Sequence, residues 1–118
     1  MMKKKPVRCV ITGLGVISAI GHNVDECWES ILASRTGIDH TRTVDTENCY
    51  ADYAAEVKDF AEKENGPDRA TALCLQAADE AMRDAGIEHF GNSPRSSVIV
   101  GSCVGGGRSL EHYYRAGK

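Results

Sequence analysis

Cys103 is the side chain with the clearest capacity for chemistry, because it lies inside a glycine-rich run, Gly101–Gly107. A short apolar stretch, residues 97–100, precedes this run, and a helix-compatible segment, residues 108–115, comes after it. A strand that passes through such a turn into a helix is typical of a nucleophile elbow. A helix N-terminus also favours the thiolate form of a cysteine. Nucleophilic catalysis by Cys103 is therefore one hypothesis.

That hypothesis requires a general base within hydrogen-bonding distance of the thiol. The histidines of the chain all fall in segments with loop or surface character: His22, His40, His89 and His112. We therefore favour Cys103 as a structural thiol that fills a gap beside the loop, and keep catalysis at this residue as an alternative. The glycines could instead cradle a phosphate, but the run lacks the lysine of a P-loop.

A second glycine-containing stretch, Val7–Gly21, begins with β-branched residues and reaches Gly13 and Gly15. An apolar run that ends in glycines predicts a first strand buried on both faces. The spacing partly matches a dinucleotide-binding fingerprint, but Ser18 stands where the third glycine is required. No acidic residue closes a second strand about 20 residues further on, where a ribose partner belongs. We therefore assign these glycines to close backbone packing.

Composition excludes several classes of function. Lys and Arg number 14 against 17 Asp and Glu, a net charge of −3, so we expect no nucleic-acid partner and no membrane surface. No apolar run is long enough to span a bilayer. Pro6 and Arg8 interrupt the entry to the first apolar run, which argues against a secretion signal. The sequence thus predicts a cytoplasmic protein.

The five cysteines are odd in number and include no CxxC pair. This pattern supports neither a zinc site nor a disulfide framework. The default expectation is a set of buried thiols in a reducing compartment. We predict no metal and no cofactor.

Local signals place a helix after the first glycine-containing stretch. Asn23 and Glu26 form a capping-box-like pair, and an apolar stripe at helical spacing comes after them. Trp28 lies on that stripe and is predicted to anchor a core. Residues 54–57 fit a short edge strand, within an otherwise polar and irregular region.

A second helix is predicted from the cap at Asp68 to the stop at Gly86. Its alanine-rich face indicates close packing against a neighbour. Its charged residues are interpreted as a solvated face: Arg69, Asp79, Glu80, Arg83 and Asp84. Residues 97–100 form another short buried strand in this interpretation. The alternation of strands and helices predicts an α/β layer fold.

Taken together, the segments resemble one family. VITGLGVISAIGHNVDECWESILASRTGI is similar to the amino-terminal signature of the β-ketoacyl-acyl-carrier-protein synthases, elongating members of the thiolase-like condensing enzymes. AEVKDF, residues 55–60, is similar to the family's short strand, and VIVGSCVGGG, residues 98–107, resembles its glycine-rich loop. The sequence departs from the family pattern where Cys103 replaces a glycine and where Ala19-Ile20 replaces Pro-Leu.

The resemblance implies the first part of a thiolase-like αβαβα fold, in which helices cover a mixed sheet, with residues 1–118 as the N-terminal segment of the first domain. It implies decarboxylative Claisen condensation of an acyl thioester with malonyl-acyl-carrier protein, in fatty acid or polyketide elongation. The family's cysteine nucleophile and two histidines lie beyond the glycine loop. We therefore assign no catalytic residue here and expect the chain alone to be inactive. Val104 matches the loop position that borders the acyl pocket.

Acyl carrier protein is the partner that the resemblance implies, and a homodimer is the implied assembly. A non-catalytic partner of the chain-length-factor type shares this opening signature and stays an alternative. Both interpretations predict exposed apolar surface on the isolated chain, because strands buried on both faces need covering layers.

Overall fold

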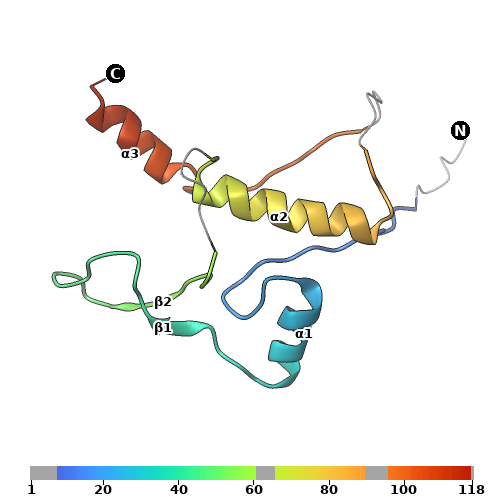
Figure 1. Ribbon diagram of the computed structural model, residues 1–118, viewed down its shortest axis with the longest axis horizontal. Helices are drawn as coiled ribbons and strands as arrows, with labels where there is room; N and C mark the ends of the chain where they lie inside the picture. The colour runs from blue at the N-terminus through green and yellow to red at the C-terminus, as the bar shows by residue number, and fades with distance from the viewer. Residues whose placement is uncertain (1–7, 61–65, 90–95, 118) are drawn as a thin grey trace, which may run out of the picture.

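The computed structural model describes residues 8–60, 66–89 and 96–117. Within these ranges the helices are α1 (Val24–Leu32), α2 (Arg69–Asp84) and α3 (Gly107–Arg115). Strands β1 (Ile38–His40) and β2 (Tyr53–Ala55) pair antiparallel, with Asp39 opposite Ala54. The long α2 lies in the middle, α3 lies near its N-terminal end, and α1 and the strand pair lie on one side (Figure 1). The presence of helices together with a strand pair confirms the predicted α/β class.

The first helix begins where the sequence predicts, because two side chains satisfy its free N–H groups. Asn23 Oδ1 accepts from Glu26 N, and Glu26 Oε2 accepts from His22 N, both at 2.8 Å. The returning carboxylate reaches one residue further back than in the usual capping box. The hydrogen bond from His22 N–H, followed by one from Asn23, lowers the pKa of Glu26.

Trp28 is 59% exposed, so the prediction that it anchors a core is wrong. The covered side of α1 carries Cys27 and Ser30, the buried residues of the described part of the chain. The Cys27 thiol donates to Gly21 O at 3.3 Å, and the Ser30 hydroxyl donates to Ile20 O at 2.7 Å.

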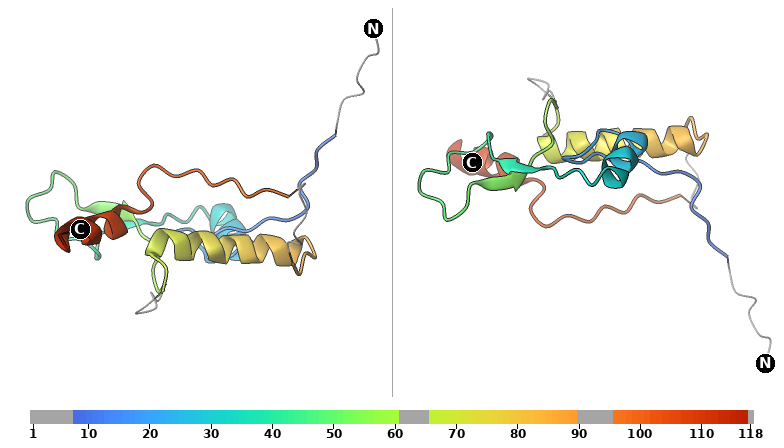
Figure 2. Two further views of the ribbon diagram at one scale, coloured as in Figure 1. Left: turned by 90° about the horizontal axis from the view of Figure 1, so that it is seen from above. Right: turned by 90° about the horizontal axis from the view of Figure 1, so that it is seen from below.

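Residues 13–16 run along α2 at very short range, and Figure 2 shows this N-terminal segment beside the helix in both views. A methyl group at Gly15 would overlap the carbonyl oxygen of Ala77, and one at Gly13 would overlap that of Ala81. The alanine-rich face of α2 and the two glycines therefore let backbone meet backbone. The packing role predicted for these glycines is confirmed.

Two carboxylates of α2 complete this contact. Leu14 N donates to Asp84 Oδ2 at 2.9 Å, and Val16 N donates to Glu80 Oε2 at the same distance. The other oxygen of Glu80 accepts from Val24 N at 2.8 Å, at the start of α1. These N–H groups have no ladder partner, so the carboxylates satisfy donors that would otherwise be unpaired.

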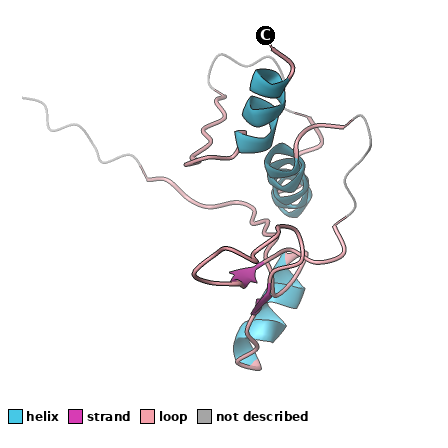
Figure 3. Ribbon diagram, turned by 90° about the vertical axis from the view of Figure 1, so that its left-hand side faces the viewer, coloured by secondary structure: helices cyan, strands magenta, loops and turns pink. Residues whose placement is uncertain are grey.

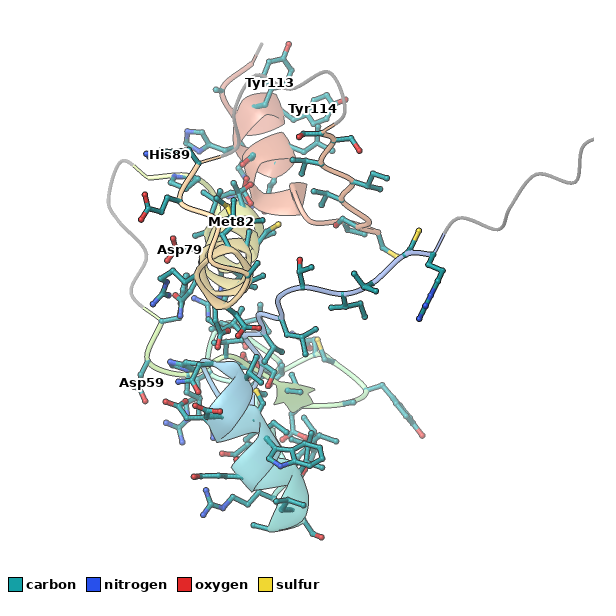
Figure 4. All side chains as sticks on the ribbon, turned by 90° about the vertical axis from the view of Figure 1, so that its right-hand side faces the viewer. Asp59, Asp79, Met82, His89, Tyr113 and Tyr114 are labelled. Atoms are coloured by element: carbon teal, nitrogen blue, oxygen red, sulfur yellow. The ribbon has the colours of Figure 1, made fainter. Side chains whose placement is uncertain are left out.

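The interpretation of the charges of α2 as a solvated face needs correction. Glu80 and Asp84 bind the N-terminal segment, and the Arg69 guanidinium donates to Val57 O at 2.6 Å. Asp79 and Arg83 do form an exposed pair at 3.1 Å. Figure 4 shows Asp79 on the outer side of α2, away from the N-terminal segment.

The ends of α2 agree with the predicted signals. Asp68 Oδ1 accepts from Thr71 N at 3.1 Å at the start of the helix. At the other end Gly86 has a φ of +66°, and Ile87 N donates to Met82 O at 2.9 Å. This is a Schellman stop, which uses the left-handed conformation that glycine adopts without strain.

The predicted buried strands at residues 7–17 and 97–100 are not strands in the described chain, and Figure 3 draws both segments as loops. Val7 itself lies outside the described residues. Val10 is 76% exposed and Ile99 is 92% exposed, so the prediction of burial is wrong for this chain. The physical reason is that neither segment has a neighbouring strand to complete its hydrogen bonds.

The predicted excess of exposed apolar surface is confirmed. The accessible surface is 10,789 Å², whereas a compact monomer of 12.7 kDa exposes about 6,200 Å² by the usual size scaling. Exposed large apolar side chains contribute to this excess. They include Val10 and Ile11 near the N-terminus and Val98 and Ile99 before the glycine-rich loop.

A short strand is confirmed at Tyr53–Ala55, one residue earlier than expected, and its partner β1 was not predicted. Glu56 directly follows β2, and its carboxylate accepts hydrogen bonds from residues 41–43, which come after β1. Its carboxylate accepts from Thr41 Oγ1, from Thr43 Oγ1 at 2.6 Å and from Arg42 N at 3.0 Å. These hydrogen bonds, led by that from Thr41, lower the pKa of Glu56 to about 2.

Replacing Gly15 by alanine is expected to open the contact between residues 13–16 and α2. Overpacking of this kind costs about 1–3 kcal/mol, so exchange of the Val16 and Val24 amide hydrogens should accelerate by roughly 5- to 150-fold. Gly101→Ala is the matched control, because nothing lies within 4 Å of a Cβ at that position. Equal exchange rates in the two variants would contradict the packing role of Gly15.

Acidification is expected to release the residues bound by Glu56 only at very low pH. A carboxyl whose folded pKa is depressed contributes stability that is complete above its unfolded pKa and is lost as the pH falls through the folded pKa. For Glu56 this window runs from 4.5 down to about 2. The amide chemical shifts of Arg42 and Thr43 should titrate with a midpoint near 2, and Glu56→Gln should abolish the titration. A midpoint near 4.5 would show that these hydrogen bonds do not form in solution.

Candidate functional site

A pocket of about 700 Å³ lies between the N-terminal half of α2, the glycine-rich loop and the start of α3. Ala70, Thr71 and Cys74 line it from α2, and residues 100–107 line it from the loop. Leu110 contributes from the first turn of α3. The predicted glycine run therefore does border a cavity, and its other wall comes from α2.

Short hydrogen bonds shape the loop. Gly105 N donates to Ser102 Oγ at 2.9 Å, and Gly107 N donates to Val104 O at 3.1 Å. Gly105 also approaches α2 closely, because a Cβ built on it would lie 3.4 Å from the Ala70 Cβ. The loop then enters α3, whose Leu110 N donates to Gly106 O at 3.0 Å. The helix predicted for residues 108–115 is confirmed at Gly107–Arg115.

Cys103 is exposed on the wall of this pocket, so the prediction that it fills a gap is wrong. The prediction of buried thiols also fails for Cys9, Cys49 and Cys74, which are exposed, and holds for Cys27. The glycines near Cys103 in the loop provide no side chains that could cover its thiol.

No histidine is among the described residues that line the pocket. His22 lies in the turn before α1, His89 comes after α2, and His112 lies on α3. His40 lies in β1, where its Nδ1 is 2.7 Å from Asp52 Oδ2. The structure therefore brings no histidine to the described lining of this pocket, in agreement with the sequence-based expectation, although the carboxylate of Asp68 does line it.

Val104 lines the pocket and is 78% exposed. Its position agrees with the family position that borders an acyl chain, but its role stays a prediction. Sequence reasoning missed the residues of α2 that share the pocket, Ala70 and Cys74. Their spacing of four residues places them on one helix face, which was a usable signal for a common wall.

Two further classes of site are absent from the described part of the chain. No group of three or more His, Cys, Asp or Glu side chains there could hold a metal ion. Across residues 8–60, 66–89 and 96–117, no helix has the length and apolar character needed to cross a membrane.

The fold and the pocket define a small α/β chain in which a glycine-rich loop and a central helix border an open, largely apolar pocket. The chain belongs to the family of the β-ketoacyl synthase N-terminal domain, whose match covers residues 7–118. The resemblance found in the sequence motifs is thus confirmed.

Curated relatives carry the name 3-oxoacyl-[acyl-carrier-protein] synthase 2. The protein from Coxiella burnetii is 33% identical over 117 residues, which are 92% of this chain and 28% of the relative. The protein from Staphylococcus aureus strain MRSA252 is 35% identical over 113 residues, 89% of this chain and 27% of the relative. The chain therefore spans less than a third of the length of these relatives.

Proposed function

We propose that residues 1–118 are the opening segment of the N-terminal domain of a 3-oxoacyl-acyl-carrier-protein synthase. The observation that supports this proposal most strongly is the family match over residues 7–118, which includes the glycine-rich loop beside the apolar pocket. The relatives named as synthases align with nearly the whole chain.

In this proposal the two unpaired segments become strands of a layered αβαβα fold. Residues 8–12 and 97–100 are exposed and lack a neighbouring strand, which suits strands of a mixed sheet covered by helices. Later residues of a longer polypeptide supply the missing strands and the covering layers. The 118 residues alone, without those layers, are inactive.

The proposed reaction is a decarboxylative Claisen condensation in fatty acid or polyketide elongation. An acyl group passes from its carrier to a cysteine outside this segment, malonyl-acyl-carrier protein loses CO₂, and the resulting carbanion attacks the acyl thioester. The reaction releases the cysteine thiolate and leaves a 3-oxoacyl group on the carrier. The described residues contribute the acyl pocket, where Val104 limits the space open to the chain. The enzyme acts as a cytoplasmic homodimer without a metal or cofactor.

A chain-length-factor-type partner is the second candidate. Its support is the same family match over residues 7–118, because the residues that separate the two candidates are not among those matched here. Such a protein would contribute the same fold and pocket but would need a catalytic synthase subunit. Nucleophilic catalysis by Cys103 itself lacks a histidine among the described residues that line the pocket.

The test is condensation by the complete polypeptide that includes residues 1–118, with acyl and malonyl groups loaded on acyl carrier protein. The Val104→Phe variant should lose activity toward long acyl chains several-fold more than toward short ones, because the larger ring fills part of the pocket. Val44→Phe is the control, since Val44 is exposed and lies outside the residues that line the pocket.

The outcomes separate the two candidates. Condensation by the polypeptide alone supports the synthase. Condensation only after a ketosynthase subunit is added supports the partner. No condensation in either assay would contradict both candidates, and equal activities of the Val104→Phe and Val44→Phe variants would contradict the role of Val104.

A further inference from the structure

Two free thiols from distant parts of the sequence line the same pocket. Cys74 comes from the N-terminal half of α2 and Cys103 from the glycine-rich loop, and both are exposed. The other cysteines lie elsewhere in the described chain. Cys27 is buried against Gly21 O, and neither Cys9 nor Cys49 lines the pocket.

The contact between Gly105 and α2 joins the two segments that carry these thiols. A Cβ on Gly105 would lie 3.4 Å from the Ala70 Cβ. Cys74 lies one helical turn after Ala70 on the same face, about 5–6 Å between their Cβ atoms. Cys103 precedes Gly105 by two residues, within the turn closed by the bond from Gly105 N to Ser102 Oγ. Cys74 and Cys103 therefore line the same pocket, Cys74 from α2 and Cys103 from the glycine-rich loop.

The loop also has freedom to adjust. Residues 101–104 are exposed, and nothing lies within 4 Å of a Cβ built on Gly101 or Gly106. A disulfide requires a Cα–Cα separation of roughly 4.4–6.8 Å, so a bond between these residues would report directly that the loop approaches α2 at Cys74. The wall on α2 is fixed by helical hydrogen bonds, so the loop is the part that moves.

We propose that Cys74 and Cys103 form a reversible disulfide that fastens the glycine-rich loop to α2. The oxidant is a peroxide. One thiolate attacks the O–O bond, which leaves a sulfenic acid and releases water after protonation. The second thiol attacks that sulfur, the S–S bond forms, and a second water leaves. Two thiols thus lose two hydrogens and two electrons, and a dithiol reductant reverses the reaction.

The bond would cross the pocket beside Val104 and narrow the space between the loop and the helix. Only this consequence for acyl binding rests on the proposed function, because formation of the disulfide requires no enzymatic activity. Disulfides in reducing compartments are usually transient and redox-sensing, which suits a pair of exposed thiols at an adjustable wall.

The test is peroxide treatment of the full chain, followed by alkylation in denaturant and peptide mass mapping. We expect the loss of two of the five free thiols and a single linked peptide pair that contains Cys74 and Cys103. Dithiothreitol should restore both thiols. Cys74→Ser and Cys103→Ser should each abolish the link, and Cys49→Ser, which alters an exposed thiol outside the pocket, should retain it.

Three results would overturn the proposal: no linked pair, a different linked pair as the main product, or equal formation of the Cys74–Cys103 link in denatured chain. The last result would show that the fold does not direct the pairing. Because this mapping involves no acyl substrate, a failed condensation assay leaves the disulfide proposal intact, and an absent disulfide leaves the synthase proposal intact.

Discussion

The close approach of residues 13–16 to α2 is the contact on which the N-terminal half of this structure depends. A backbone without side chains at Gly13 and Gly15 lies against helix backbone at Ala77 and Ala81. This approach places the Val16 N–H in a partly buried environment, and a buried donor left unpaired costs about 1–3 kcal/mol. Glu80 accepts from Val16 N and removes that cost, and Asp84 accepts from the exposed Leu14 N in the same segment. Packing and hydrogen bonding therefore require each other.

This contact also positions the first helix. Glu80 reaches Val24 N at the start of α1, so a single carboxylate joins α2, the N-terminal segment and α1. The 18–21 turn between them is held against α1 by Cys27 and Ser30. At the opposite end of α2, Ala70 lies close to Gly105 of the glycine-rich loop, and the loop and the helix together line the pocket. One helix with a face of small residues thus organises both glycine-containing stretches.

Local signals predicted the parts of the fold that local interactions determine. The sequence correctly predicted the helix caps at Asn23 and Asp68 and the helix end at Gly86. Each of these features depends on hydrogen bonds or backbone angles within a few residues of the chain. Trp28 and residues 97–100 were misjudged, because burial depends on which neighbours are present. Glu80 and Asp84 looked like solvated charges, since spacing alone cannot show that backbone donors from another segment face them. For the site, the sequence identified the glycine-rich loop, whereas the role of Val104 stays a prediction and the shared wall with Cys74 required the geometry of α2.

Amide hydrogen exchange of the unmodified chain, read residue by residue, tests the contact between residues 13–16 and α2 most directly. That contact predicts slow exchange at Leu14, Val16 and Val24, whose N–H groups the carboxylates of α2 bind. Exchange should be fast at Val10 and Ile99, which expose their side chains and have no strand partner. Fast exchange at all five positions, or protection of Val10 and Ile99 in the chain alone, would contradict this arrangement.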